Sequence, residues 1–291
     1  MKYRITHITR YSYSEPVSLC HNLAHLKLRS QPTQTDINSQ VRIDPLPSVS
    51  REFRDYFGNQ VNYFAVQQPH QKLTITSISE VNIVPPTPIT PVLDQSWETV
   101  IATLDQNLNE DVLEARLFTM DSLYIRTNTD LLDYALPSFV PERPFLECVA
   151  DLMTRIYKEY TYDPNSTSIG TPLDELLINK RGVCQDFAHL AIGCIRSLGL
   201  PARYVSGYLE TIPPPGVPKL QGADASHAWF SVYSPTMGWI DFDPTNNIIP
   251  NDQHITTAVG RDFSDVTPVK GVSYGGGTHS LNVSVDVERL T

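Results

Sequence analysis

The first eighty residues alternate between apolar and polar side chains with a period of two. The alternation is clearest in three pairs: Tyr3 and Ile5, Val41 and Ile43, and Leu73 and Ile75. Alternation of this kind is typical of half-buried strands, and turn signals such as Asp44-Pro45 and Gly58-Asn59 separate the runs. The pattern therefore predicts an antiparallel β-sandwich domain over residues 1–84.

A proline-rich segment follows the predicted strands. It contains Pro85, Pro86, Pro88 and Pro91. Because proline lacks a backbone N–H and fixes φ, this segment can neither continue a sheet nor form a helix interior. We interpret residues 85–95 as a linker and residues 96–291 as a second domain.

Helical periodicity appears only after this linker. Apolar residues recur at helical spacing over three stretches, namely 97–108, 145–156 and 184–198, and the last ends at Gly199. Period-two stretches then predict strands, which are Ala202–Leu209, Ala228–Tyr233, Gly238–Phe242 and, after a glycine-rich loop, a C-terminal strand through residues 281–287. Between them, the proline-rich piece 212–216 is expected to form a surface loop. The mixture predicts an α+β fold, with helices packed on an antiparallel sheet.

Composition and charge exclude several classes of function. The formal net charge is −10 and no cluster of Lys and Arg opposes it, so binding to nucleic acid is not expected. No apolar run approaches the roughly 18–20 residues that cross a bilayer, and the N-terminus does not read as a signal peptide. The four cysteines show neither disulfide nor metal spacing. We expect a soluble cytoplasmic protein without a membrane partner, in which a free thiol survives.

Cys184 is the first candidate for chemistry. It follows Gly182 and begins the third helical stretch, so its thiol lies at the first turn of a helix. Unpaired N–H groups and the helix dipole favour an anion there, and the thiolate is the nucleophilic form of cysteine. The same N–H groups can receive an oxyanion when an acyl carbon is attacked. A cysteine on an apolar helix is more often a core residue, and we assign that role to Cys20, Cys148 and Cys194.

His227 and Asp243 lie on two strands that are expected to form a hairpin. The turn between the strands is centred near Pro235, which is also the midpoint of positions 227 and 243. Asp243 is therefore predicted to lie across from His227, whereas Asp241 would face position 229. Taken singly, a histidine or an aspartate here reads as a surface or turn residue. Together with Cys184, they match the nucleophile, base and orienting carboxylate of acyl transfer.

Several longer stretches resemble the bacterial transglutaminase-like proteins. The resemblance lies in residues 182–189 and 198–208, in His227-Ala228-Trp229, and in residues 238–245. Residues 3–7 and 55–59 resemble the N-terminal β domain of this family, and residues 259–268 its C-terminal portion. The resemblance implies a papain-like cysteine-enzyme core whose catalytic Cys, His and Asp correspond to Cys184, His227 and Asp243.

The resemblance leaves some positions open. Relatives often carry an acidic residue two positions after the tryptophan of the His-Ala-Trp motif, where this chain has Ser231. A second oxyanion donor is not identifiable; Tyr160 and Tyr162 are candidates, although core packing is the more usual role of such residues. Asp186 is interpreted as a helix N-terminal acid and Arg203 as a framework cation.

The predicted function is attack of Cys184 on a peptide or carboxamide bond through a thioester, with a peptide or protein as substrate. Water as the acceptor makes a protease or amidase, which we favour; an amine makes a transglutaminase. A non-catalytic peptide-binding protein on the same fold is the alternative from another class. No cofactor or metal is expected, because His7, His21, His25 and His70 lack metal-ligand spacing. The oligomeric state stays open.

Overall fold

The structure is a computed structural model and describes residues 1–211 and 226–290. The predicted surface loop at 212–216 therefore lies outside the described residues. The strands are β1 (Lys2–Ala24), β2 (Gln34–Asp44), β3 (Val49–Arg54), β4 (Gln60–Val66), β5 (His70–Ile83), β6 (Thr161–Tyr162), β7 (Arg181–Gly182), β8 (Ala202–Leu209), β9 (Ser226–Ser234), β10 (Gly238–Phe242), β11 (His254–Gly260), β12 (Val269–Gly275) and β13 (His279–Leu290). The helices are α1 (Trp97–Gln106), α2 (Glu110–Arg116), α3 (Thr129–Ala135), α4 (Phe145–Glu159), α5 (Leu173–Asn179), α6 (Cys184–Ser197) and α7 (Phe263–Val266), with short 3₁₀ turns at Pro91–Leu93 and Leu117–Thr119.

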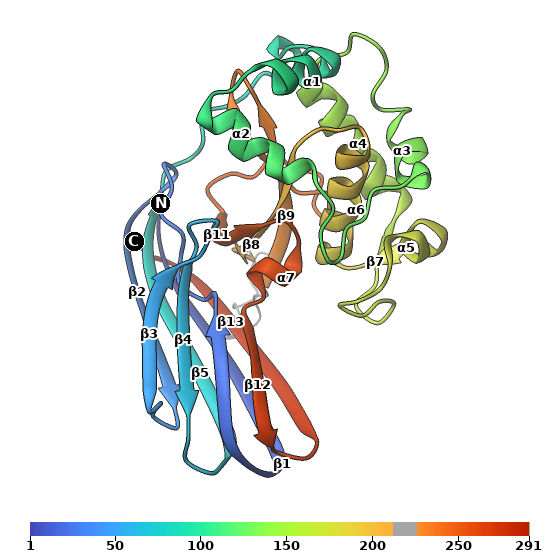
Figure 1. The fold of residues 1–291 in the computed structure, drawn as a ribbon. Coiled ribbons are helices and arrows are strands. Elements are labelled where there is room, and N and C mark those ends of the chain that lie inside the picture. The colour runs from blue at the N-terminus through green and yellow to red at the C-terminus, as the bar shows by residue number, and fades with distance from the viewer. Residues whose placement is uncertain (212–225, 291) are drawn as a thin grey trace, which may run out of the picture.

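The long strand β1 organises the first sheet. Its first half pairs with β5 on one side and β13 on the other, and its second half pairs with β4 and β12. All seven strands are therefore joined in one antiparallel sheet through β1, as Figure 1 shows. The buried, alternating side chains on both halves of β1 share their hydrophobic clusters with β4, β5 and β13. The antiparallel β architecture predicted for the N-terminal region is confirmed, whereas its folding into a two-layered sandwich stays a prediction.

The predicted domain boundary is wrong for the C-terminal strands. The sequence assigns residues 96–291 to the second domain together with a C-terminal strand segment, but β12 and β13 pair with β1 and complete the N-terminal sheet. Lys2 lies opposite Leu290, so the two ends of the chain are side by side (Figure 1). The alternation at 281–287 predicts a strand correctly but cannot name its partner, because pairing across most of the chain has no local signature.

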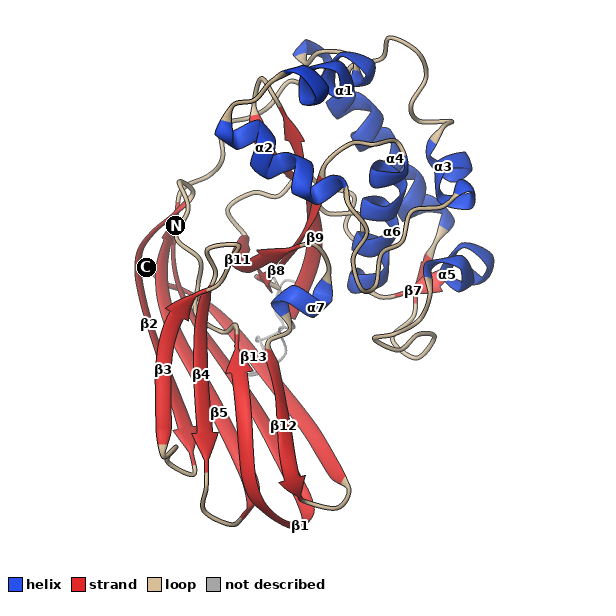
Figure 2. Ribbon diagram, in the orientation of Figure 1, coloured by secondary structure: helices blue, strands red, loops and turns tan. Residues whose placement is uncertain are grey.

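A second, four-stranded sheet has the order β10-β9-β8-β11. Its helix-facing side packs against α6, on which α3 and α4 pack in turn, and the large hydrophobic cluster there includes Ile192, Phe230 and Phe242. Side chains of β8 and β11 also join the cluster of the first sheet, in which Tyr208 and Ile255 contact Tyr3 and Ile5. Figure 2 shows the helices gathered at the end of the molecule opposite the hairpins of the first sheet. The predicted α+β fold is confirmed.

The shared cluster makes the two sheets depend on one another. Ile255 of β11 is fully buried in that cluster. Ile255→Ala should lower the free energy of unfolding by about 2–5 kcal/mol, because the cavity it leaves is only partly filled. Ile178→Ala is the control, since this side chain is 82% exposed and its loss should change stability little. Urea unfolding followed by fluorescence measures the unfolding free energies of both variants. Equal losses of stability in Ile255→Ala and Ile178→Ala would contradict the shared core.

Candidate active site

Cys184 is the first residue of α6, as the helical pattern predicts. The residue before it, Val183, donates its backbone N–H to the Asp186 carboxylate at 2.8 Å, so the acid of the first turn caps the helix start. Gly182 is required for this arrangement, because a Cβ there would lie 2.8 Å from Asp186 Oδ2. The glycine therefore serves close packing, and the thiol sits among the free N–H groups of a helix N-terminus.

The four cysteines fall into two groups. Cys20, Cys148 and Cys194 are buried, whereas Cys184 is partly exposed. Burial raises the pKa of the Cys148 thiol to about 12 and also raises that of Cys194. Burial thus holds the Cys148 and Cys194 thiols in the protonated form, and Cys184 is the one of the four cysteines that is partly exposed.

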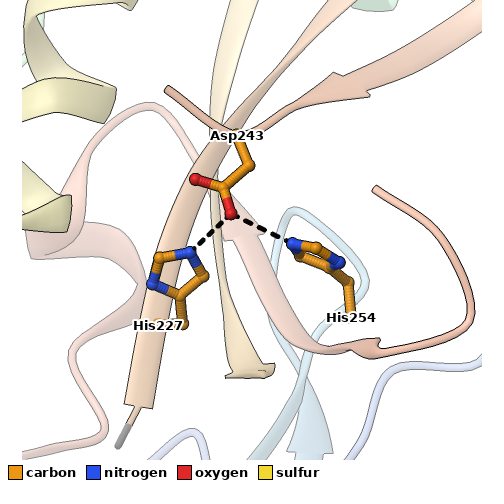
Figure 3. A group of neighbouring side chains, drawn as sticks. All are labelled: His227, Asp243 and His254. Carbon is orange, nitrogen blue, oxygen red and sulfur yellow. Dashed lines mark hydrogen bonds and ion pairs between the residues drawn. The ribbon is translucent and has the colours of Figure 1, made fainter. Parts of the chain in front are cut away.

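His227 and Asp243 are hydrogen bonded. His227 lies near the start of β9, and its Nε2 is 2.8 Å from Asp243 Oδ2, just beyond the end of β10 (Figure 3). Asn246 Nδ2 lies 3.4 Å from the same Nε2, and interaction with the Cys184 side chain contributes to raising the pKa of the imidazole, so the thiol lies near the ring. The structure therefore brings together the three residues that the sequence singles out.

The register that was used to choose Asp243 is wrong by two positions. Gly238 pairs with Ser234, so Asp241 lies opposite Ser231 and the ladder ends at Phe242. The shift arises because the loop is centred on residue 236, with Gly238 in the left-handed region at φ 75°. Asp243 reaches His227 diagonally, a geometry that the twist of a hairpin permits. Asp241 instead accepts a hydrogen bond from Trp229 Nε1 at 3.0 Å.

The Asp243 carboxylate is fully buried and saturated with hydrogen bonds. Oδ2 also accepts from Asn246 Nδ2 at 2.7 Å and from His254 Nε2 at 3.1 Å, and Oδ1 accepts the backbone N–H groups of Thr245 and Asn246. Burial alone would raise the pKa of Asp243, but the hydrogen bonds from His227 and His254 outweigh it and hold the pKa well below its usual range. The group is a fixed anion.

The Asp243 anion changes the pKa of the His227 imidazole. Burial would lower the pKa of the imidazole, but the hydrogen bonds with Asp243 and Cys184 outweigh it and raise the pKa to about 10. At neutral pH the ring is therefore an imidazolium held between a carboxylate and a sulfur atom. An imidazolium in this place stabilises a thiolate and can give its proton to a leaving group.

His254 and Asn246 are the residues that the sequence analysis missed. His254 is buried at the start of β11, and its ring lies against Trp229 at 5.2 Å between centroids. It comes next to Asp243 because β11 pairs with β8, which in turn pairs with β9. Asn246 offers a local signal, since it follows Asp243 in a turn where an amide side chain can fold back.

His227, Asp243 and His254 also form the one group among the described residues whose side chains lie close enough to hold a metal ion together, with ligand atoms within 4.8 Å. Imidazole nitrogens with a carboxylate oxygen suit a divalent transition metal. Both Nε2 atoms, however, are already directed at the same carboxylate oxygen (Figure 3), and hydrogen bonds account for the arrangement. The expectation of no metal cofactor stays a prediction.

The two tyrosines proposed as oxyanion donors have different surroundings. Tyr160 is buried in the helical core against Phe187 and Tyr134, which is the packing role expected of it. Tyr162 is half exposed on β6, whose partner strand β7 leads into the nucleophile helix. Proximity to Cys184 and Asp186 contributes, after burial, to raising the pKa of Tyr162. Of the two tyrosines, Tyr162 is therefore the one near the Cys184 thiol.

The raised pKa of His227 gives a prediction for stability. Because its pKa in the folded protein, about 10, exceeds the ordinary value of 6.5, folding is favoured by proton binding. This contribution is complete below about pH 6.5 and is lost as the pH rises toward 10. The difference in unfolding free energy between the wild-type protein and His227→Gln should fall by at least ~2 kcal/mol from pH 6 to pH 10. Urea titrations at both pH values, with His279→Gln as the control, measure it; a constant difference would contradict it.

Comparison with known proteins agrees with the fold. Residues 3–82 match the profile of the bacterial transglutaminase-like N-terminal region, and residues 139–244 match that of the transglutaminase-like superfamily. An uncharacterized protein of Mycobacterium bovis is 42% identical over 98% of this chain and 92% of its own length. One from Mycobacterium leprae is 34% identical over 99% and 98%. No helix among the described residues is long and apolar enough to cross a membrane.

Two further matches concern proteins with a stated activity. A protein-glutamine gamma-glutamyltransferase of Pseudomonas aeruginosa is 32% identical over 39% of this chain, which is 18% of that protein. The crystal structure of a proposed cysteine protease from Cytophaga hutchinsonii covers 100% of this chain and 91% of its own, with a TM-score of 0.75 and 22% identity. The second match shows the fold alone. With both regions matched in order and relatives aligned from end to end, the chain belongs to the transglutaminase-like superfamily.

Proposed function

We propose that this protein is a cysteine-dependent acyl-transfer enzyme in which Cys184 is the nucleophile, His227 the acid and base, and Asp243 the residue that orients the imidazole. The observation that supports it most strongly is the position of His227, whose two nitrogens serve a buried anion and the Cys184 thiol. A nucleophile, a base and an orienting carboxylate in this order are the parts that acyl transfer requires.

The mechanism follows from the charges of His227 and Asp243 and from the position of Cys184. The Cys184 thiolate adds to the carbonyl carbon of a peptide or carboxamide, and the oxyanion that forms lies near the N–H groups at the start of α6. The His227 imidazolium gives its Nδ1 proton to the amide nitrogen, so the C–N bond breaks and an amine leaves. The acyl group remains on sulfur as a thioester. Neutral His227 then takes a proton from the second nucleophile, which attacks the thioester carbon; the C–S bond breaks and the Cys184 thiolate leaves.

Asp243 acts through His227 in this scheme. Its hydrogen bond to Nε2 fixes the ring so that Nδ1 faces sulfur, and its charge keeps the imidazolium stable in a buried place. Hydrogen bonds from Asn246 and His254 prevent the carboxylate from turning away. The scheme uses no cofactor.

Hydrolysis is the outcome we favour, with a peptide or protein as substrate and water as the acceptor. Cys184 is partly exposed, so water has access to a thioester formed there. The second candidate is transfer to an amine, which is supported by the match of one segment to a gamma-glutamyltransferase. The fold is compatible with both. The expected cytoplasmic location stays a prediction.

Product analysis decides between the two acceptors. The purified protein is incubated with a library of glutamine-containing peptides, with and without a primary amine, and the products are read by mass spectrometry. We expect cleaved peptides or free acids in both cases, with amine adducts forming a minor fraction. If amine adducts were the main product, the assignment as a hydrolase would be wrong and the protein would be a transferase. The Cys184→Ala variant is the control for contaminating activity.

Asp243 and Asp241 provide a matched pair for the assigned roles. Asp243→Asn should lower kcat/KM by about 10²–10⁴-fold, because the amide neither stabilises the imidazolium nor fixes its tautomer. Asp241→Asn should cost much less, since this carboxylate bonds to Trp229 and not to His227. Thermal melts of both variants test whether they are folded. A larger kinetic effect at Asp241 would overturn the assignment.

A further inference from the structure

A cavity of about 800 Å³ lies where the first sheet, the proline-rich segment and the four-stranded sheet meet. Part of its lining is apolar: Ile83, Pro86, Pro88, Trp239, Ile240 and Ile249. Three charged or titratable side chains from the four-stranded sheet also line it, namely Arg203, Asp241 and His254. Its size and mixed lining are those of a site for a small organic ligand, and Cys184 is not among its lining residues.

Arg203 lies in this lining with its charge incompletely compensated. The residue is partly buried and stays cationic at neutral pH, although burial lowers its pKa to about 10. Among the described residues its Nε has no hydrogen-bond partner. Its near neighbours are the Trp239 ring, 4.0 Å from the guanidinium carbon, and the more distant charge of Asp241. A buried cation is costly when its N–H groups are unmatched.

Arg196 shows how the same chain treats a buried arginine that serves structure. Its Nε donates to the carbonyl of Phe118, Nη1 to that of Met120 and Nη2 to those of Ala202 and Arg261. All three nitrogens are thus satisfied by the protein itself. Arg203 differs from Arg196 in that respect and in lining a cavity, so a ligand in the cavity meets a guanidinium that the protein leaves incompletely hydrogen bonded.

His254 contributes a second unmatched atom. Its Nε2 donates to the Asp243 carboxylate at 3.1 Å, so a neutral ring presents Nδ1 as a hydrogen-bond acceptor. This Nδ1 is buried and has no partner among the described residues. The cavity therefore combines a cation, an acceptor and apolar walls. Arg29, the other arginine in the lining, is engaged with Phe57 and Asn59, so the charges of Arg29, Arg203 and Asp241 leave an excess of one positive charge.

We propose that this cavity binds a small organic carboxylate with an apolar body and an N–H group, of the kind that N-acylated amino acids and peptide C-termini carry. The carboxylate pairs with Arg203, the N–H donates to His254 Nδ1, and the apolar body packs against the prolines, Ile240 and Ile249. Because His254 also holds Asp243, the ligand would lie one side chain away from the proposed triad (Figure 3).

Calorimetry with two matched probes tests this site. N-acetyl-phenylalanine and its carboxamide differ only in the carboxylate, and both are titrated into the Cys184→Ala protein so that neither is consumed. We expect the acid to bind at least about tenfold more tightly than the carboxamide, since hydrogen bonds between charged groups are the strong ones. Binding is measured without turnover, so the result stands apart from the proposed function.

Two variants locate the binding. Arg203→Met should reduce the affinity for the acid to that for the carboxamide and leave thermal stability unchanged or higher, because an uncompensated buried charge is removed. Ile249→Trp should weaken the binding of both probes because the larger side chain fills the cavity. The Ile249 side chain is 37% exposed, so the protein should tolerate the change. This variant locates the binding site if Arg203→Met does not fold. Arg51→Met, on β3, is the control. Equal affinity for the two probes, undiminished binding in the variants, or equally effective displacement by sulfate would overturn the proposal.

Discussion

The hydrogen bond between His227 and the buried Asp243 carboxylate is the interaction on which the site depends. A carboxylate with no exposed surface is unstable as an anion unless donors surround it, and Asp243 has five such contacts from side chains and backbone. Those donors keep it charged, and its charge in turn keeps His227 protonated. An imidazolium next to Cys184 then follows from the electrostatics of a single buried group.

The fold explains how that carboxylate stays buried. Strands β9, β10 and β11 bring His227, Asp243 and His254 together, and the first sheet packs behind them through Tyr208 and Ile255. Since β12 and β13 return from the end of the chain to that sheet, the C-terminal residues support the same region as the N-terminal ones. The N-terminal sheet thus belongs to the framework of the site and is more than an appended module.

Local pattern was sufficient for most elements near the site. The start of α6 at Cys184 and the bounds of β8 and β10 follow from periodicity and from Gly199 and Gly238, because capping and turn residues act over a few positions. Asp243 was selected correctly as the partner of His227 but from a register that is two positions off, since a hairpin register depends on the conformation of its turn. His254 and the partners of β12 and β13 were not predictable, because they depend on strand pairing between distant segments. The missing hydrogen-bond partner of Arg203 Nε was equally hidden, and it is what sets this arginine apart from a framework cation.

The fold of this chain does not by itself establish its reaction. Detection of a covalent acyl-enzyme intermediate tests the proposed reaction most directly. Intact-protein mass spectrometry after brief mixing with an activated p-nitrophenyl ester of an N-acylated amino acid would detect an acyl group on the protein. The account predicts one added acyl group, located on Cys184 by peptide mapping, that is absent from Cys184→Ala and forms much more slowly in Asp243→Asn. An acyl group on another residue, or its undiminished formation in Cys184→Ala, would contradict the role of Cys184 as the nucleophile.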